Sequence, residues 1–312
     1  MVAMSSLLDP YFVRISFTGP TEPTLNTLRG VVAAHNRSIP FENLDPLTGV
    51  PVVDLSAKAL ADKLIHRRRG GYCYEHNGLL GYVLDELGYD VARLAGRVVW
   101  MHEDDSLPAQ THQVLAVTLP DGDGPYLVDV GFGGQTLTSP IRLQSGPVQQ
   151  TRHEPYRLLD HPEGFELQAQ IRGAWQPLYL LNPDPRPQID LEVGSWYVST
   201  YPKSGFVVGL TAAIVTDDAR WNLRGRHLAV HRAGGTEKTR LETAAEVLDV
   251  LGETFGIDTG DLGDTVACGI GALKAAGVGA VRRIGEHRMH GASHLRGRRC
   301  AGAQIDSRPE VF

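Results

Sequence analysis

The hydrophobic positions of the first ninety residues recur at helical spacing. The pattern predicts helices over residues 24–38, 55–65 and 79–87, each with apolar side chains three or four positions apart. The first of these helices ends before Pro40, because a residue that precedes proline is disfavoured in the helical region. The N-terminal part of the chain, residues 1–90, is therefore expected to be helical.

Beyond residue 90 the pattern changes to short segments of alternating and β-branched residues, separated by turn residues. Such segments are typical of strands in an antiparallel sheet or barrel. The predicted strands cover residues 91–100, 113–119, 126–130, 157–159, 165–171 and 195–201.

A third unit of mixed character follows. Strands are predicted at residues 212–215, 221–223 and 227–231, and a helix with one apolar face is predicted at residues 241–251. Residues 266–312 are rich in glycine, alanine and arginine and poor in periodic apolar positions, so we expect a mostly disordered tail. The alternative is a tail that contacts nucleic acid or another anionic surface.

The composition is that of a globular protein. With 312 residues, of which 42% are hydrophobic, the chain can bury a substantial core. A net charge of -6 argues against a general nucleic-acid binder, which usually carries a basic surplus. The N-terminus has no basic segment followed by an apolar run, and no apolar stretch is long enough to cross a membrane. We therefore expect a cytoplasmic protein.

Cysteine usage agrees with that compartment. Cys73, Cys268 and Cys300 are odd in number and widely spaced, and no Cys-x-x-Cys pair occurs. Neither a disulfide framework nor a cysteine zinc site is indicated, and the thiols are expected to be reduced.

Cys73 has the surroundings of a nucleophile. It lies at or just before the start of the helix that Gly88 closes, where unpaired N–H groups and the helix dipole favour an anion. The basic run at residues 67–69 adds positive charge, and both effects stabilise a thiolate over a thiol. Free cysteines are more commonly core residues, but the glycine, charged and polar neighbours of Cys73 are unusual for a core.

A second group of polar residues lies on the predicted hairpin of residues 113–119 and 126–130. His112 stands at the start of its first strand, and Asp129 interrupts the apolar run of its second. If residues whose numbers sum to an odd value face each other, both side chains lie on one face. A carboxylate in an apolar strand is costly unless it is paired, and a histidine N–H is a natural partner. A structural histidine is the alternative for His112.

Two glycine-rich segments have competing interpretations. Gly131-Phe132-Gly133-Gly134 follows a predicted strand, but Thr136 replaces the third glycine of a dinucleotide-binding turn and Pro140 disfavours a following helix. A plain turn, or a turn whose amides approach a ligand, remains. Asp121-Gly122-Asp123-Gly124 lacks the further ligands of a calcium loop and is predicted to be a hairpin turn.

Taken together, several segments resemble the arylamine N-acetyltransferases. The most specific is Arg69-Gly70-Gly71-Tyr72-Cys73-Tyr74-Glu75-His76-Asn77-Gly78, which contains the pattern Arg-Gly-Gly-x-Cys-x-Glu-x-Asn. The other matching segments are Tyr11-Phe12-x-Arg14-Ile15, Ile39-Pro40-Phe41-Glu42-Asn43-Leu44, Thr111-His112, Val128-Asp129-Val130-Gly131-Phe132-Gly133-Gly134 and Ser199-Thr200-Tyr201-Pro202-x-Ser204-x-Phe206. The resemblance covers about residues 5–260, and the tail departs from the family.

The resemblance implies an α+β fold with a papain-like site between its first two units. The implied units are a helical bundle at residues 1–90, an antiparallel β-barrel at 91–205 and an α/β lid at 206–265, followed by the tail at 266–312.

A two-step transfer reaction is implied as well. Cys73 would take acetyl from acetyl-coenzyme A as a thioester, coenzyme A would leave, and the nitrogen of an arylamine, hydrazine or arylhydroxylamine would attack. His112 would act as the base and Asp129 would orient it. Acetyl-coenzyme A is the implied co-substrate and no metal is implied. The enzyme is expected to be a monomer or homodimer that binds neither nucleic acid nor membrane.

Further site residues follow from the same resemblance. The residues implied to contact coenzyme A are Thr111, Gly131, Phe132, Gly133 and Gly134. The residues implied to line an apolar acceptor pocket are Phe41, Tyr72, Trp100 and Phe206. Core packing is the alternative for each of these aromatic residues. Glu42 and Arg69 are expected to form a buried supporting pair, and the N–H of Cys73 is a candidate oxyanion donor.

Two other classes of function stay open at the level of the sequence. A cysteine hydrolase, such as an amidase, would use the same three residues to transfer an acyl group to water. A binding protein with a degenerate site would leave Cys73 no more reactive than the other cysteines. A metal protein is disfavoured, because Met101-His102-Glu103 lacks a second ligand at helical spacing.

Overall fold

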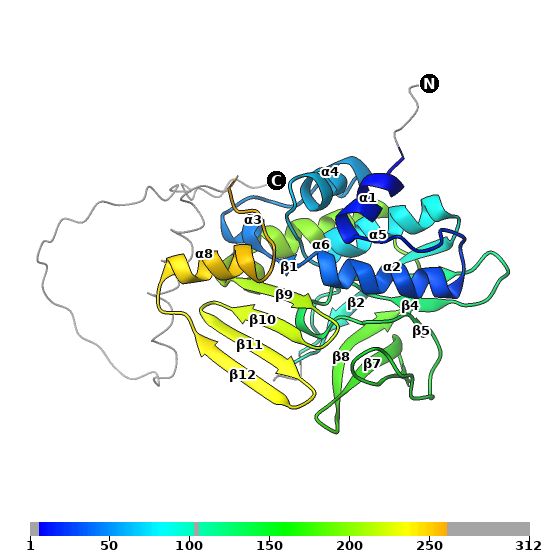
Figure 1. Ribbon diagram of the computed structural model, residues 1–312. Helices are drawn as coiled ribbons and strands as arrows, with labels where there is room; N and C mark the ends of the chain where they lie inside the picture. The colour runs from blue at the N-terminus through cyan, green and yellow to red at the C-terminus, as the bar shows by residue number, and fades with distance from the viewer. Residues whose placement is uncertain (1–5, 103–105, 261–312) are drawn as a thin grey trace, which may run out of the picture.

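The computed structural model describes residues 6–102 and 106–260. Helices dominate the first part of the chain, and strands dominate the rest. The helices are α1 (Leu8–Ile15), α2 (Leu25–Ser38), α3 (Leu44–Leu47), α4 (Ala57–Ala61), α5 (Cys73–Leu87), α6 (Gln188–Thr200), α7 (Gly205–Val208) and α8 (Ala244–Glu253). A π-helical turn, η1 (Asp62–His66), continues α4. Figure 1 shows α1, α2, α4 and α5 gathered at one end of the molecule.

Helix α5 contains the apolar pattern at residues 79–87, and its ends agree with the prediction that Cys73 stands at or just before its start and that Gly88 closes it. Its first residue is Cys73, and Gly88 terminates it in the left-handed conformation with φ of 92°. The apolar face of α5, which includes Leu80 and Leu84, is fully buried, and the helix packs against strands of the barrel sheet. The start of α2 also agrees, because the Thr24 side chain accepts the N–H of Thr27 as an N-cap.

The larger sheet is antiparallel and curls into a nearly closed barrel. Its strand order is β5-β4-β3-β2-β8-β7-β6. The strands are β2 (Asp90–Val98), β3 (His112–Thr118), β4 (Tyr126–Val128), β5 (Ile141–Arg142), β6 (Tyr156–His161), β7 (Gly164–Ile171) and β8 (Ala174–Asn182). Two isolated bridges, from Ser145 to Leu158 and from Gln149 to Tyr156, connect the chain after β5 to β6 across the opening.

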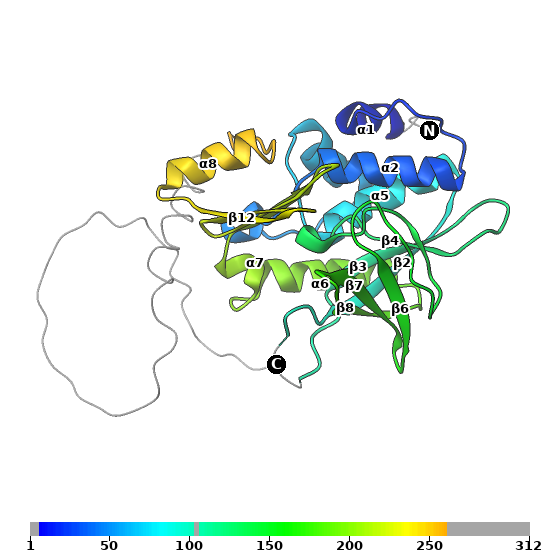
Figure 2. The same cartoon turned by 60° about the horizontal axis from the view of Figure 1, so that its bottom comes forward.

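The smaller sheet lies mainly in the segment expected to be a lid, and we refer to it as the lid. Its antiparallel order is β1-β9-β10-β11-β12. The strands are β1 (Phe41–Glu42), β9 (Thr211–Val215), β10 (Arg220–Arg224), β11 (His227–Arg232) and β12 (Gly235–Arg240). Because β1 comes from the helical part, the lid is joined to it by backbone hydrogen bonds. Figures 1 and 2 show α8 on one face of this sheet, where Val247 and Leu251 enter its apolar core.

The fold confirms the predicted α+β architecture, with one wrong segment. Residues 195–201 were expected to be a strand, yet residues 195–200 form the end of α6 and Tyr201 caps it. Their aromatic and β-branched residues favour strands locally, but Leu191, Ser195 and Val198 are buried at helical spacing. The predictions for the tail, together with Cys268 and Cys300, lie outside the described residues.

None of the helices in the part of the chain that the structure describes combines the length and the apolar character that a bilayer crossing requires.

Five ionic side chains form a buried network beneath the start of α5. Arg69 Nη2 lies 2.9 Å from a carboxylate oxygen of Glu42 and 2.9 Å from one of Asp45, so the predicted pair of Glu42 and Arg69 is present. Lys63 Nζ lies 2.6 Å from Asp45 and 2.6 Å from Glu75. Burial lowers the pKa of Lys63, but the surrounding carboxylates raise it by more, so the amine stays charged.

This network holds the backbone on the N-terminal side of the predicted nucleophile. The second carboxylate oxygen of Glu75 accepts the N–H of Tyr72 at 3.1 Å, which caps the start of α5. The N–H of Glu42 donates to the carbonyl of Gly71 at 2.8 Å. Cys73 therefore follows a segment whose backbone is tied to two buried carboxylate residues.

Replacing Lys63 with Met is expected to lower the free energy of unfolding by about 3–5 kcal/mol, because Glu75 and Asp45 lose their buried partner. Burial raises the pKa of Glu75 to about 7, so the loss should shrink as the pH falls and this carboxylate takes up a proton. Urea unfolding at several pH values measures both effects.

The matched control is Arg37→Ala, which breaks an exposed pair with Asp217 and is expected to cost about 1 kcal/mol or less. Equal losses in the two variants would show that the buried network does not stabilise the fold.

Candidate active site

Cys73, His112 and Asp129 come together where the helical part meets the barrel. Cys73 is the first residue of α5, His112 the first residue of β3, and Asp129 the first residue after β4. Nε2 of His112 lies 2.8 Å from Oδ2 of Asp129. The sulfur of Cys73 lies 3.7 Å from the carbonyl oxygen of Thr111, the residue next to His112. All three side chains are buried.

The register of the β3–β4 hairpin produces the contact between His112 and Asp129. Leu115 pairs with Val128, so facing residues have numbers that sum to an odd value. The sequence left this register open, and it is the one that brings His112 and Asp129 to the same face. The same pairing confirms that residues 121–124 form a hairpin turn. Strand β4 ends at Val128, so Asp129 lies just beyond the strand. There its carboxylate accepts the N–H of Gly131.

Asp129 is fully satisfied by hydrogen-bond donors. Besides His112, its Oδ1 accepts Nδ2–H of Asn77 at 2.9 Å and the N–H of Gly131 at 2.9 Å. Asn77 also donates to the carbonyl of Gln113 at 2.7 Å. The sequence interpretation assigned no role to Asn77, although this residue belongs to the motif around Cys73.

The electrostatics of the site favour a charged imidazole. Burial lowers the pKa of His112, but the charge and hydrogen bond of Asp129 raise it, and Cys73 adds to the rise, to about 10. Burial raises the pKa of Asp129, yet His112 and the other donors hold it below its usual range. The imidazolium is therefore the favoured form of His112 at neutral pH, and the nearby sulfur of Cys73 adds to that preference.

Aromatic rings pack against the imidazole and contribute to its burial. The ring of Phe132 meets the His112 ring edge-on at 5.2 Å between centroids, and the ring of Tyr179 lies at 4.9 Å. Tyr179 comes from β8, a strand that the sequence pattern did not reveal.

Gly131 permits the close approach of the barrel to α5. A Cβ atom at this position would lie 2.6 Å from Cα of Cys73, closer than a real side chain can come. The glycine-rich turn thus approaches the backbone of the nucleophile, and glycine is needed at Gly131 for that reason.

A cavity of about 1640 Å³ opens above Cys73. The predicted residues that line it are Phe41, Cys73, Trp100, Thr111, His112, Gly131, Phe132, Gly133, Gly134 and Phe206. Tyr72 lies behind this wall. Its ring stacks on Phe206 at 5.3 Å, it is fully buried, and its hydroxyl lies 2.8 Å from Oγ of Ser195.

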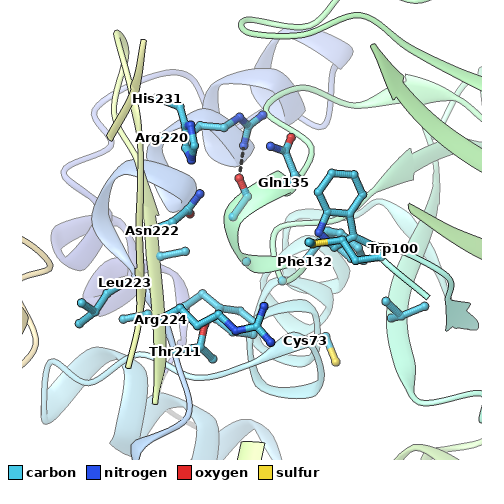
Figure 3. A pocket seen from close by; sticks show the side chains of 18 of the residues that line it. Cys73, Trp100, Phe132, Gln135, Thr211, Arg220, Asn222, Leu223, Arg224 and His231 are labelled. Atoms are coloured by element: carbon cyan, nitrogen blue, oxygen red, sulfur yellow. Dashed lines mark hydrogen bonds between the residues drawn. The ribbon is translucent and has the colours of Figure 1, made fainter. Parts of the chain in front are cut away.

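The opposite wall of the cavity belongs to the lid. Figure 3 shows Arg220, Asn222 and Arg224 along β10, facing Trp100 and Phe132 of the barrel. These lid residues were not predictable from the sequence, because alternating polar positions on a strand look the same whether they face a cavity or bulk solvent.

In the part of the chain that is described, no group of three or more His, Cys, Asp or Glu side chains is arranged to hold a metal ion.

Comparison with known proteins agrees with this geometry. A family model described as N-acetyltransferase matches residues 24–262. The chain is 68% identical over 260 residues to the arylamine N-acetyltransferase of Mycolicibacterium smegmatis. This match covers 83% of this chain and 94% of that protein. The chain belongs to the arylamine N-acetyltransferase family. It is also 64% identical to the arylamine N-acetyltransferase of Mycobacterium tuberculosis, over 82% of this chain and 91% of that protein.

Solved arylamine N-acetyltransferase structures share the fold. The M. smegmatis enzyme superposes with a TM-score of 0.83 at 67% identity, covering 86% of this chain and 98% of that one. The Mycobacterium marinum enzyme in complex with CoA gives a TM-score of 0.83 at 63% identity, covering 84% of this chain and 98% of that one.

Replacing Asp129 with Asn is expected to lower the pKa of His112, because the carboxylate that favours the imidazolium is lost. Cys73 then lacks its charged partner at pH 7, and alkylation of Cys73 by iodoacetamide should slow by about tenfold, the equivalent of one pKa unit. Peptide-level mass spectrometry measures the rate.

The control is Asp123→Asn, which removes a carboxylate in the hairpin turn. This variant is expected to leave the alkylation rate of Cys73 unchanged. An unchanged rate in Asp129→Asn as well would contradict a charged imidazole at the site.

Proposed function

We propose that this chain transfers an acetyl group from acetyl-coenzyme A to the nitrogen of an arylamine, hydrazine or arylhydroxylamine. The observation that carries the proposal is the buried contact of His112 with Asp129 beside Cys73. The high identity to curated arylamine N-acetyltransferases supports the choice of substrates.

In the first half-reaction, the thiolate of Cys73 attacks the carbonyl carbon of acetyl-coenzyme A. The new carbon–sulfur bond to Cys73 replaces the bond to coenzyme A. The departing sulfur takes the proton of the His112 imidazolium, so coenzyme A leaves as a thiol. The backbone N–H of Cys73, in the first turn of α5, is our candidate donor to the oxyanion.

In the second half-reaction, the acceptor nitrogen attacks the thioester carbonyl. Neutral His112 takes a proton from the nitrogen, and the bond between carbon and the Cys73 sulfur breaks. The products are the amide and the original pair of imidazolium and thiolate. Throughout both steps Asp129 stays ionised, fixes the ring through Nε2 and stabilises its positive charge.

The acceptor pocket is proposed to be apolar. Phe41, Trp100 and Phe206 line the cavity near Cys73, and Tyr72 supports Phe206 from behind. Aromatic amines suit such a pocket, because their rings pack against aromatic side chains. Their nitrogen is also neutral at pH 7, so it attacks without first losing a proton.

Coenzyme A is proposed to occupy the part of the cavity between the barrel and the lid. Thr111 and the residues of the turn at 131–134 are our candidate contacts. Cationic side chains line the same space, and Arg172, Lys203 and Arg224 have no ion pair within the described residues. Their charge complements phosphate groups. The solved M. marinum enzyme in complex with CoA supports this choice of co-substrate.

We also propose that the enzyme works in the cytoplasm as a monomer or homodimer. The proposal for the compartment rests on the cysteine usage of the chain, in which the thiol of Cys73 must stay reduced to act.

Initial rates over a grid of acetyl-coenzyme A and arylamine concentrations test the proposed function. We expect parallel double-reciprocal lines, because coenzyme A leaves before the amine reacts. The amide product should form faster than free acetate.

Intersecting lines would contradict the covalent order of steps. Release of acetate at the rate of coenzyme A release, with no amide formed, would identify the rival hydrolase. The control is Cys73→Ala, which should abolish both products.

A further inference from the structure

Three buried side chains behind the active site form a chain of hydrogen bonds that the proposed reaction does not use. Tyr11 on α1, His35 on α2 and His76 on α5 are each no more than 1% exposed. The Tyr11 hydroxyl lies 2.8 Å from Nδ1 of His35, and Nε2 of His35 lies 2.8 Å from Nδ1 of His76. Nε2 of His76 lies 3.1 Å from the carbonyl oxygen of Pro40. Three helices are thereby linked to the segment that enters β1.

The end of this chain fixes the direction of each hydrogen bond. A carbonyl oxygen only accepts, so Nε2 of His76 carries a hydrogen. In a neutral ring Nδ1 is then an acceptor, and it receives Nε2–H of His35. Nδ1 of His35 in turn receives the hydroxyl hydrogen of Tyr11. While both rings are neutral, no other placement of hydrogens satisfies all three contacts.

Both rings are neutral at pH 7 and the hydroxyl keeps its hydrogen. Burial lowers the pKa of His76 to about 4, and burial together with His76 and Arg14 lowers the pKa of His35 well below its ordinary value. Burial raises the pKa of Tyr11. The series of hydrogen bonds starts at the fully buried hydroxyl of Tyr11 and ends at a carbonyl. It therefore holds the two imidazole rings in place and does not conduct protons to solvent.

The ring of His76 also forms the support of Phe41. The two rings are within 17° of parallel, with centroids 6.3 Å apart. Phe41 lines the cavity, and its ring centroid lies 6.0 Å from that of Phe206. His76 stands one turn after Cys73 on α5 and holds the carbonyl that precedes Phe41. One side chain thus links the helix that carries the nucleophile to a wall of the pocket.

We propose that His76, kept in a single tautomer by His35 and Tyr11, is a positioning residue that places Phe41 and so determines how well different aromatic amines fit. The role in the pocket rests on the proposed function, whereas the direction of the hydrogen bonds rests on the geometry of the three contacts. His76 acts through Phe41 and does not itself line the cavity.

Nitrogen-15 NMR of the full-length protein, labelled in histidine, tests the direction of the hydrogen bonds. We expect two histidines in the neutral form with hydrogen on Nε2, unchanged between about pH 8 and about pH 6, where exposed histidines titrate. Their signals are assigned by their loss in His35→Gln and His76→Gln. A hydrogen on Nδ1 of either ring in the native protein would overturn the inference.

Half-reaction kinetics test the positioning role. His76→Leu removes the hydrogen bonds to His35 and to the Pro40 carbonyl, so Phe41 is held less firmly. The KM for a two-ring arylamine should rise by about tenfold, the equivalent of one hydrogen bond's net contribution. The rate of Cys73 acetylation by acetyl-coenzyme A should stay within about twofold. His76→Gln keeps one donor and one acceptor and should restore most of the loss, and Tyr11→Phe should give an intermediate KM.

Equal losses in both half-reactions, or a Gln variant no better than the Leu variant, would overturn the positioning role. If the Leu variant does not fold, the Gln and Phe variants and the native NMR spectrum still decide the question. A native protein that does not acetylate Cys73 would refute the proposed function and the pocket role with it. Normal acetylation with the wrong tautomer would refute the inference alone.

Discussion

The buried carboxylate of Asp129 is the constraint on which the arrangement of the site depends. A charge that water cannot reach is tolerated only when it is paired and hydrogen-bonded. The donors come from His112 at the start of β3, from Asn77 on α5 and from the backbone of Gly131. The helical part and the barrel must therefore meet at this one point, and Cys73 is carried there by the same helix.

The first turn of α5 is held from three directions by consecutive residues. Glu75 pairs with Lys63 of η1, His76 bonds to His35 of α2, and Asn77 bonds to Asp129 of the barrel. Each partner belongs to a different element, so the turn cannot rotate without leaving a buried polar group unsatisfied. This explains why a helix so rich in polar residues at its start is buried there, and it places the nucleophile with little freedom.

Much of this was predictable from local patterns. The limits of α5, the β3–β4 hairpin and the pairing of His112 with Asp129 follow from periodicity, from Gly88 and from a charge in an apolar strand.

Contacts that depend on distant packing were not predictable. The segment at 195–201 has the composition of a strand and became helical because α6 buries residues at helical spacing. Lys63 looks like a surface residue until the π-helical turn directs it inward, and Tyr179 lies on a strand with a weak pattern. Arg220 and Arg224 of the lid occupy alternating polar positions, and in the sequence such positions look like those of any exposed sheet face.

The central claim is that Cys73, activated by His112, carries the acetyl group. Peptide-level mass spectrometry after mixing the protein with acetyl-coenzyme A, without acceptor, tests it most directly. We predict an acetyl group on the peptide that contains Cys73, discharged when an aromatic amine is added and absent in His112→Ala. An acetyl group on any other residue, or equal acetylation without His112, would contradict the account.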